Sequence, residues 1–318
     1  MRTLIYGGAG FIGTHVAQAL CASGDEVVIA DIVEPTIGVP GARFVRCDVR
    51  RPITIDPGDG FDRVFNLAAV HRTPGHQPSE YYETNVLGAQ NVVDWCENTG
   101  TTTVIFTSSI SVYGPSEESK SEASEPTPNG DYGRSKLIAE SVHRHWAASS
   151  PTNRLTIVRP AVVFGRGEQG NFTRLAQALA RGRFMYAGRT DTVKSCGYVE
   201  DLVDAMLYVD GLGKPETIFN FCYDHRYTIE EICQTFHRVA GYGLPRMLPR
   251  RLLKTAMTTL RIVNPNDRGP IVAARIAKLT LSTNIEPAFL REHGYTWPTD
   301  LEGGLRAWLE RSGTGTFE

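Results

Sequence analysis

The chain has little of several features that would assign it to a specialised class of protein. Its 318 residues include 33 basic and 35 acidic side chains, so the formal net charge is only −2. This balance gives no electrostatic reason for nucleic acid or an anionic membrane to be the main partner. No apolar run approaches the roughly 20 residues that a membrane-spanning helix needs. These absences predict an ordinary soluble globular protein with neither nucleic acid nor membrane as its partner.

Cysteine is also scarce, and it follows no ligand pattern. The six cysteines are scattered along the chain and form no CxxC pair, which argues against a disulfide framework and against a zinc site. The first residues, "MRTLIYGGAGFIG", are too short and too rich in glycine in their apolar part to be a signal peptide. We therefore predict a cytoplasmic protein with reduced thiols and no metal.

Strand patterns alternate with helix patterns over the first half of the chain. Short β-branched runs occur at 3–6, 26–30, 43–47, 63–68, 103–108, 155–160 and 217–222, and helical patterns at 12–23, 80–98 and 133–148 lie between most of them. This alternation predicts an α/β fold with a Rossmann-type, doubly wound parallel sheet of about seven strands. After residue 165, helical patterns dominate, at 171–182, 200–210, 228–240 and 300–311. We predict a sheet domain over 1–165, to which 190–222 returns, and a smaller, mainly helical lobe over 166–318.

A glycine-rich turn follows the first expected strand and opens the first expected helix. "YGGAGFIG" (6–13) places glycines at 7, 8, 10 and 13, which permits a tight turn and a close approach of a pyrophosphate to the helix N-terminus. Asp31 ends the second expected strand, 18 residues after Gly13. An acid at that place binds ribose hydroxyls and repels a 2′-phosphate. The sequence therefore predicts a dinucleotide site that prefers NAD to NADP.

Tyr132 and Lys136 form the only pair in the chain in which a lysine follows a tyrosine by four residues. On a helix these positions share a face, so the phenol and the ammonium can converge. The cation is then expected to favour the phenolate and to lower a tyrosine pKa that is otherwise about 10. Such a tyrosine can act as a general acid or base. An exposed polar helix face is the competing interpretation of the pair alone.

Several motifs in order give the whole chain a family resemblance. They are "GGAGFIG" (7–13), "CDVR" (47–50), "NLAAV" (66–70), "TNVLGAQNV" (84–92), "TSSISVYG" (107–114), "YGRSK" (132–136), "RPAVVFG" (159–165) and "YVEDLVDAM" (198–206). With them the chain resembles the NAD-dependent epimerase/dehydratase group of the extended short-chain dehydrogenases/reductases, which acts on nucleotide sugars. The sequence departs from the group at Tyr6, Asn66 and Asp131, where Thr, His and Pro are usual, and none of these changes removes a reacting group.

The resemblance implies roles for individual residues. Ser109 would be the catalytic hydroxyl, Tyr132 the acid and base, and Lys136 the group on the nicotinamide ribose. The cofactor-binding residues would be Gly7, Gly10, Phe11, Ile12, Gly13, Asp31, Asp48, Val49, Leu67, Ala68, Ala69, Asn85, Thr107, Tyr132, Lys136 and Pro160. The substrate-binding residues would be Ser109, Tyr132, Asn171, Arg174, Lys194 and Arg268. Asp48 and Val49 would flank the adenine, Asn85 would brace the centre of the site, and Asn171 would touch the substrate diphosphate.

The reaction is narrowed by two positions after the catalytic hydroxyl. Dehydratases of the group carry an Asp-Glu pair there, whereas this chain has Ile110 and Ser111, and neither can transfer a proton near neutral pH. This argues against a 4,6-dehydratase and favours inversion at C4 of a nucleotide sugar through a transient 4-keto intermediate. An NAD-dependent oxidoreductase acting on a sugar or sterol-like alcohol is the alternative. A cofactor-binding regulatory protein without catalysis is a third possibility, which the intact Ser109, Tyr132 and Lys136 argue against.

The resemblance also implies partners. The substrate would be a nucleotide-diphosphate sugar, which places the activity in polysaccharide biosynthesis. The helices at 80–98 and 133–148 occupy positions that pair between subunits in the group, so we expect a homodimer. Their apolar residues Tyr81, Val92, Trp95, Leu137, Val142 and Trp146 are expected to exceed what one subunit needs.

Overall fold

The computed structural model describes residues 1–71, 75–248 and 281–317. Its centre is a seven-stranded sheet in the order β11-β7-β5-β4-β1-β2-β3, in which every neighbouring pair is parallel. The sequence prediction of a doubly wound sheet of about seven strands is confirmed. The strands are β1 (Arg2–Tyr6), β2 (Glu26–Asp31), β3 (Ala42–Arg46), β4 (Arg63–Asn66), β5 (Thr103–Thr107), β7 (Arg154–Pro160) and β11 (Glu216–Phe221).

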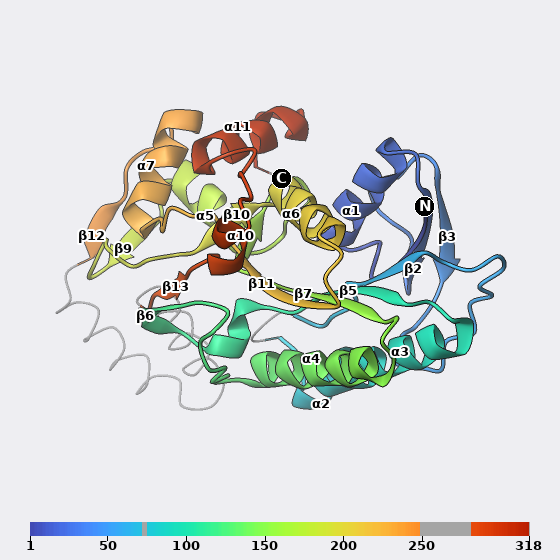
Figure 1. Cartoon of the computed structure of the whole chain (residues 1–318). Coiled ribbons are helices and arrows are strands. Elements are labelled where there is room, and N and C mark those ends of the chain that lie inside the picture. The colour runs from blue at the N-terminus through green and yellow to red at the C-terminus, as the bar shows by residue number, and fades with distance from the viewer. Residues whose placement is uncertain (72–74, 249–280, 318) are drawn as a thin grey trace.

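Helices cover both faces of the sheet, as Figure 1 shows. Helices α1 (Phe11–Ala22) and α6 (Val199–Gly211) lie on one face, and α3 (Gly88–Thr99) and α4 (Asp131–Ser149) lie on the other. Each face has its own apolar core: Val16, Leu20 and Met206 belong to one, and Val92 and Trp146 to the other. Because both faces are covered, these strands are almost wholly buried, and their interior positions are mostly apolar.

The strand order reverses between β1 and β4. The chain runs outward from β1 through β2 to β3, and then crosses to β4 on the other side of β1. In sheets of this kind, ligands bind beyond the carboxyl ends of the strands at such a reversal. The residues that follow β1 and β4, from Gly7 and from Leu67, therefore mark where a ligand is expected.

The helix expected over 80–98 is interrupted. It consists of α2 (Pro78–Tyr82), a π-helical turn η1 (Glu83–Leu87) and α3. A π turn widens a helix and is frequent at functional sites. The apolar periodicity of the sequence does not reveal it, because only one extra residue is inserted. Asn85 lies within this turn and is 2 % exposed.

A third apolar core, which includes Phe172, Phe236 and Trp308, is built from residues after 160. The helices expected after residue 165 are all present, as α5 (Asn171–Ala180), α6, α7 (Ile229–Ala240) and α11 (Leu301–Ser312). Short elements lie between them: η2 (Ile110–Tyr113), β6 (Ser116–Lys120), β8 (Val162–Phe164), β9 (Met185–Ala187), β10 (Cys196–Tyr198), β12 (Arg246–Leu248), β13 (Thr283–Ile285) and α10 (Ala288–Glu292). Three parallel strand pairs form, β10 with β8, β12 with β9 and β13 with β6. The division of function at residue 165 stays a prediction.

Four of the six apolar residues expected to pair between subunits lie inside the subunit instead, and the other two, Leu137 and Val142, are half-buried. Tyr81, Val92, Trp95 and Trp146 are between 0 and 5 % exposed. Val92, Trp95 and Trp146 belong to the core between the sheet and helices α3 and α4. Tyr81 lies in α2, with its ring near that of Tyr132. None of the four is left for a partner. The exposed apolar side chains on this stretch are Leu87 at 47 % and Ile138 at 43 %.

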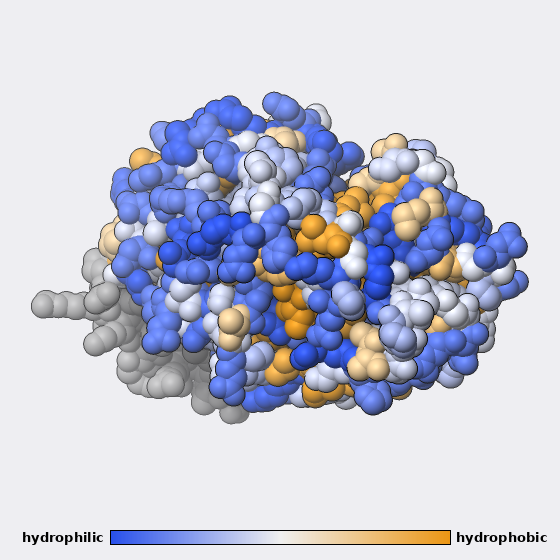
Figure 2. Space-filling view, viewed as in Figure 1, coloured by the Kyte–Doolittle hydropathy of each residue, from blue (hydrophilic) through white to orange (hydrophobic). Residues whose placement is uncertain are grey.

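The surface is mainly hydrophilic in the view of Figure 2. Hydrophobic residues gather in a band down the middle of that face, over the region where β11, β7 and α4 lie in Figure 1. Among the described helices, none combines the length and the apolar character needed to cross a membrane.

Candidate active site

The glycine turn after β1 is packed so closely that side chains are excluded. Gly7 has φ +74, and a Cβ there would lie 2.5 Å from the amide nitrogen of Ala68. A Cβ on Gly13 would lie 2.4 Å from the carbonyl oxygen of Gly7. The glycines therefore let the turn, α1 and the end of β4 come together, as the spacing predicted. Phe11 and Ile12 begin α1 directly after the turn.

The N-terminus of α1 is open to an anion. Gly10 is the N-cap residue, no side chain accepts a hydrogen bond there, and the first turn contains no acidic residue. The free amides and the helix dipole favour a negatively charged group at this position. The turn therefore has the shape and the polarity that a pyrophosphate requires.

Asp31 ends β2 beside this turn. Its Oδ2 accepts a hydrogen bond of 3.1 Å from the Ala9 amide, and its Oδ1 accepts one of 2.7 Å from the Ile32 amide. Each carboxylate oxygen has a second lone pair, so the side chain can still accept hydrogen bonds from two ribose hydroxyls. Asp31 stands where the sequence placed it, at the end of the strand next to β1.

The segment after β3 is fixed by contacts that the sequence did not suggest. The Asp48 carboxylate forms a two-pronged ion pair with Arg50, at 2.8 and 2.7 Å, and this holds the pKa of Asp48 below its usual range. Asn91 of α3 donates to the Val49 carbonyl at 2.7 Å. The two residues predicted to flank the adenine are thus anchored from both sides.

Asn85 fastens the segment after β4 to α4. Its Oδ1 accepts a hydrogen bond of 2.9 Å from the Val70 amide, and its Nδ2 donates to the Val70 carbonyl at 3.1 Å and to Ser135 Oγ at 2.9 Å. Leu67, Ala68 and Ala69, predicted to line the cofactor, precede Val70 and are partly exposed. Asn85 therefore spans from the predicted cofactor segment to the residue beside Lys136.

Ser109 and Tyr132 meet at the carboxyl end of β5. Ser109 is the N-cap residue of η2 and is 8 % exposed; its Oγ donates to Ser111 Oγ at 3.0 Å. Tyr132 is the second residue of α4 and is partly exposed. A hydrogen bond with Ser109 acts to lower the pKa of Tyr132. The two residues predicted to share one substrate oxygen are thus within reach of each other.

Lys136 lies one turn further along α4 and is 1 % exposed. Its Nζ donates to the Thr107 carbonyl at 2.7 Å and lies 4.9 Å from the centre of the Phe106 ring. Burial lowers the pKa of Lys136 to about 7, and the Glu140 carboxylate opposes this shift. Thr107, which ends β5, keeps a buried hydroxyl without a hydrogen-bond partner in the described part of the chain.

The expected lowering of the Tyr132 pKa by Lys136 is wrong. Burial raises the pKa of Tyr132 above its ordinary value, although the Ser109 hydrogen bond opposes it. The reason is that Lys136 is itself desolvated and directs its Nζ to the Thr107 carbonyl. Spacing on a helix shows that two groups share a face, but it does not show how deeply each is buried.

The predicted substrate residues are only partly brought together. Asn171 begins α5, and Arg174 approaches its Oδ1 at 3.5 Å; both side chains are exposed. Lys194 lies on another segment, where its Nζ donates to the Leu281 carbonyl at 2.5 Å. Pro160 ends β7 and is buried. Arg268 lies outside the described residues.

Glu168, which the sequence analysis does not single out, affects the prediction that Asn171 binds the diphosphate. Its Oε2 accepts a hydrogen bond of 2.8 Å from the Thr173 amide, and the residue is 7 % exposed. A carboxylate already occupies part of the N-terminus of α5, so the helix end alone is a poor diphosphate site. Asn171 and Arg174 would have to bind the diphosphate through their side chains.

One departure from the resembled group is compensated inside the core. Asn66, at the position where His is usual, donates from Nδ2 to His143 Nε2 at 3.1 Å, and His143 Nδ1 donates to the Ala139 carbonyl at 2.7 Å. Burial lowers the pKa of His143 to about 4, so the ring is neutral. It stacks on Phe106, with 4.1 Å between ring centres, beneath Lys136.

Comparison with known proteins agrees with this arrangement. Residues 3–222 match the family model "NAD dependent epimerase/dehydratase family". The chain is 30% identical over 320 aligned positions to N-acetyl-alpha-D-glucosaminyl-diphospho-ditrans,octacis-undecaprenol 4-epimerase of Escherichia coli O157:H7, covering 97% of this chain and 94% of the relative. It is 29% identical to UDP-glucose 4-epimerase of Streptomyces lividans, covering 79% of this chain and 84% of the relative.

A solved structure provides an independent comparison. MoeE5 in complex with UDP-glucose and NAD superposes with a TM-score of 0.74 at 26% identity, over 98% of this chain and 99% of that one. The site geometry, the length of the family match and the near-complete coverage by an epimerase agree with each other. The chain belongs to the NAD-dependent epimerase/dehydratase family.

Proposed function

We propose that the chain is an NAD-dependent nucleotide-sugar 4-epimerase. The observation that carries the proposal is the meeting of Ser109 and Tyr132 at the carboxyl end of β5, with Lys136 one turn away and no acid–base residue at 110 or 111. Ile110 is buried, and the Ser111 hydroxyl is bonded to Ser109. A second acid and base for dehydration is therefore missing from the positions where the family's dehydratases carry them.

Residues of the glycine turn and of the strand ends would hold the cofactor. The turn at Gly7–Gly13 and the open end of α1 fit a pyrophosphate, and Asp31 fits the adenosine ribose. Lys136 and the Thr107 hydroxyl, which has no hydrogen-bond partner among the described residues, fit the nicotinamide ribose. When bound, NAD supplies an acceptor and then a donor for the hydride of the reacting sugar carbon. Asp48 and Val49 would flank the adenine.

The chain's own residues would handle the proton. Tyr132 takes the proton of the C4 hydroxyl as the carbonyl forms. It returns the proton to the same oxygen after the 4-keto sugar has rotated in the site and presents its other face. Ser109 donates a hydrogen bond to that oxygen and stabilises the charge that develops on it. Because burial raises the pKa of Tyr132, the reaction requires neighbouring groups that favour the phenolate. The Lys136 ammonium and the Ser109 hydroxyl are placed to do so.

Product analysis tests this function directly. The purified protein is incubated with UDP-, GDP-, CDP- and TDP-sugars, and the products are identified by NMR and mass spectrometry. The expected result is inversion at C4 without any net change in the absorbance of reduced nicotinamide. A stoichiometric change in that absorbance, with an oxidised or reduced product, would instead establish the oxidoreductase alternative.

A second substrate class enters the same experiment. The relative from Escherichia coli O157:H7, which matches nearly the whole chain, is named for a sugar on a polyprenyl diphosphate rather than on a nucleotide. Both carriers present a sugar attached to a diphosphate, so the same catalytic residues serve both. Polyprenyl-diphospho-N-acetylglucosamine in detergent is therefore tested beside the nucleotide sugars, and the ratio of the two kcat/KM values decides between the carriers.

The cofactor proposal predicts a preference for NAD over NADP. Because the Asp31 carboxylate would face the 2′-phosphate, we expect NADP to bind about tenfold more weakly or worse. The Asp31→Asn variant should narrow the gap by removing the charge, whereas Glu34→Gln, an exposed acid three residues further on, should leave it unchanged. Calorimetry with both dinucleotides measures this. Equal affinities in the unmodified protein would contradict it.

We also propose a homodimer that forms through the outer faces of η1 and α4. The support comes from the exposed apolar side chains of Leu87 and Ile138. Light scattering at micromolar concentration should give twice the mass of one chain, and Ile138→Glu should reduce it to one chain mass. A monomeric mass for the unmodified protein would contradict the proposal.

The biological setting proposed for the enzyme is polysaccharide biosynthesis in the cytoplasm. All six cysteines are unpaired, which suits a reducing compartment, and sugar diphosphates are the activated forms from which glycans are built. Cell fractionation with detection of the protein would check the location.

A further inference from the structure

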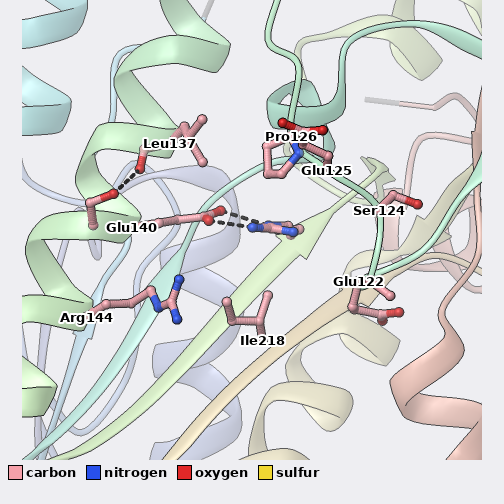
Figure 3. A pocket seen from close by; sticks show the side chains of 11 residues that line it. Glu122, Ser124, Glu125, Pro126, Leu137, Glu140, Arg144 and Ile218 are labelled. Carbon is pink, nitrogen blue, oxygen red and sulfur yellow. Dashed lines mark hydrogen bonds and ion pairs between the residues drawn. The ribbon is translucent and has the colours of Figure 1, made fainter.

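A buried ion pair lies one helical turn beyond Lys136. Glu140 of α4 and Arg159 of β7 are 2 % and 4 % exposed. Arg159 Nε donates to Glu140 Oε1 at 2.8 Å, and Arg159 Nη2 donates to Glu140 Oε2 at 2.6 Å. Figure 3 shows the Glu140 carboxylate reaching from α4 toward the strands, with dashed lines marking this pair. The pair lines a cavity of ≈ 300 Å³, and Leu137 and Ile218 line it too.

The pair is bonded to the strand end that carries the catalytic hydroxyl. Ser108 Oγ donates to Glu140 Oε1 at 2.5 Å. Ser108 lies between Thr107, whose carbonyl accepts the Lys136 ammonium, and Ser109. On the other side, Arg159 Nη1 donates to the Tyr113 hydroxyl at 2.7 Å, at the end of η2. The pair therefore holds both ends of the short segment from 108 to 113.

We propose that the Glu140–Arg159 pair is a positioning element of the active site. It fixes the Thr107–Ser109 segment through Ser108, and it gives Lys136 the neighbouring anion that keeps its ammonium charged. The catalytic consequence rests on the proposed function, but the effect on Lys136 itself does not. Both side chains are buried and bond to Ser108 and Tyr113, so the pair acts through other residues.

The charges around Lys136 show why an anion matters there. From β5 the ammonium faces the Thr107 carbonyl and the Phe106 ring, and from α4 its ionisable neighbours are Tyr132, Glu140 and His143. Burial raises the pKa of Tyr132 and lowers that of His143 to about 4, so both are neutral near pH 7. The Glu140 carboxylate is the charge that opposes the desolvation of Lys136. Arg159 holds that carboxylate in place through two hydrogen bonds, of 2.8 and 2.6 Å.

A purely structural role predicts something different. A buried ion pair can often be replaced as a whole by neutral side chains of similar shape without loss of stability, whereas removing one partner leaves an uncompensated charge. If the pair is only structural, the single variants should fail to fold, and the double variant should recover the fold, the Lys136 midpoint and the activity. If the pair is a positioning element, the double variant should fold, but the titration midpoint of Lys136 should not return to its original value.

The test is a titration of Lys136 in the absence of substrate. The chain has only six lysines, so protein labelled with [ε-13C]lysine gives few signals, and the Lys136→Met variant assigns the one of interest. In Glu140→Gln and in the double variant Glu140→Gln/Arg159→Met, the midpoint of Lys136 should move by about one pH unit or more to lower pH. If Glu140→Gln does not fold, the double variant decides. Glu216→Gln breaks the exposed pair with Arg144 on the same helix and should leave the midpoint unchanged.

Kinetics on the accepted sugar supply a second readout. The folded double variant should have a kcat at least about tenfold lower with KM changed less than about twofold, because orientation rather than binding is lost. Ser108→Ala should lower kcat while leaving the Lys136 midpoint in place. A double variant with the midpoint and kcat of the unmodified protein would overturn the proposal. If no sugar is turned over, the proposed function fails, and the titration still decides the role of Glu140.

Discussion

Replacing Tyr132 by phenylalanine should lower kcat by about 10²- to 10⁴-fold, the range expected when a general acid and base is lost. The variant keeps the ring, which packs near Tyr81 with 6.2 Å between ring centres, so folding should be unchanged. NAD binding should also survive, because the glycine turn and Asp31 lie on other elements. Steady-state kinetics on the accepted sugar, together with calorimetry for NAD, measure both effects.

A neighbouring tyrosine supplies the control. The Tyr82 hydroxyl donates to Asp131 Oδ1 at 3.2 Å, one residue before Tyr132. Tyr82→Phe makes the same chemical change within the same pair of helices and should keep kcat within a few-fold. The kcat of Ser109→Ala should lie between those of Tyr132→Phe and Tyr82→Phe, because this change removes one hydrogen bond to the reacting oxygen and leaves the base in place. A Tyr132→Phe enzyme with unimpaired turnover would refute the assignment of the acid and base.

The sequence could predict the sheet and the glycine turn because their signals are local. Strands of β-branched residues alternate with amphipathic helices, and the glycines at 7, 10 and 13 stand between one strand and one helix. Asp31 was located by its distance along the chain from the turn. Each of these inferences needs only neighbouring residues and the geometry of one βαβ unit.

The electrostatics of the site could not be predicted in this way. Whether Lys136 lowers the pKa of Tyr132 depends on how deeply each side chain is buried, and elements far apart in the sequence determine that burial. The Glu140–Arg159 pair joins residues 19 positions apart on a helix and a strand, and neither belongs to a motif that signals the other. The sequence pattern also does not predict the π turn at Glu83–Leu87, because one inserted residue barely changes the spacing of the apolar residues.

Replacing Lys136 by methionine should abolish most of the turnover while making the folded protein more stable near neutral pH. The activity falls because the variant lacks the ammonium that is placed to favour the Tyr132 phenolate during the reaction and to bind the nicotinamide ribose, so weaker NAD binding is expected too. The activity that is left should shift to higher pH, because Tyr132 loses its neighbouring cation. Kinetics across the pH range and calorimetry for NAD measure these effects.

The stability gain follows from the burial of the ammonium. The pKa of Lys136 is 10.5 in the absence of burial and about 7 in the folded chain. Between these values the unfolded chain binds one more proton than the folded chain, so this lysine makes the free energy of unfolding rise with pH. The lysine therefore lowers the free energy of unfolding most at and below about pH 7. Methionine has a similar length and no charge. At about pH 6.5 the variant should be more stable by on the order of a few kcal/mol, and the difference should shrink at about pH 9.5.

Thermal unfolding at the two pH values tests this without any substrate. The Lys136→Met variant should have a Tm several degrees above that of the unmodified protein at the lower pH and a smaller difference at the higher one. Lys214→Met, at an exposed lysine, should show no such pH-dependent gain. A Lys136→Met protein that is less stable at about pH 6.5 would mean that the hydrogen bond to the Thr107 carbonyl and the Glu140 carboxylate outweigh the desolvation of the ammonium. A gain in stability together with a loss of turnover would show that this lysine is retained for catalysis at the expense of the fold.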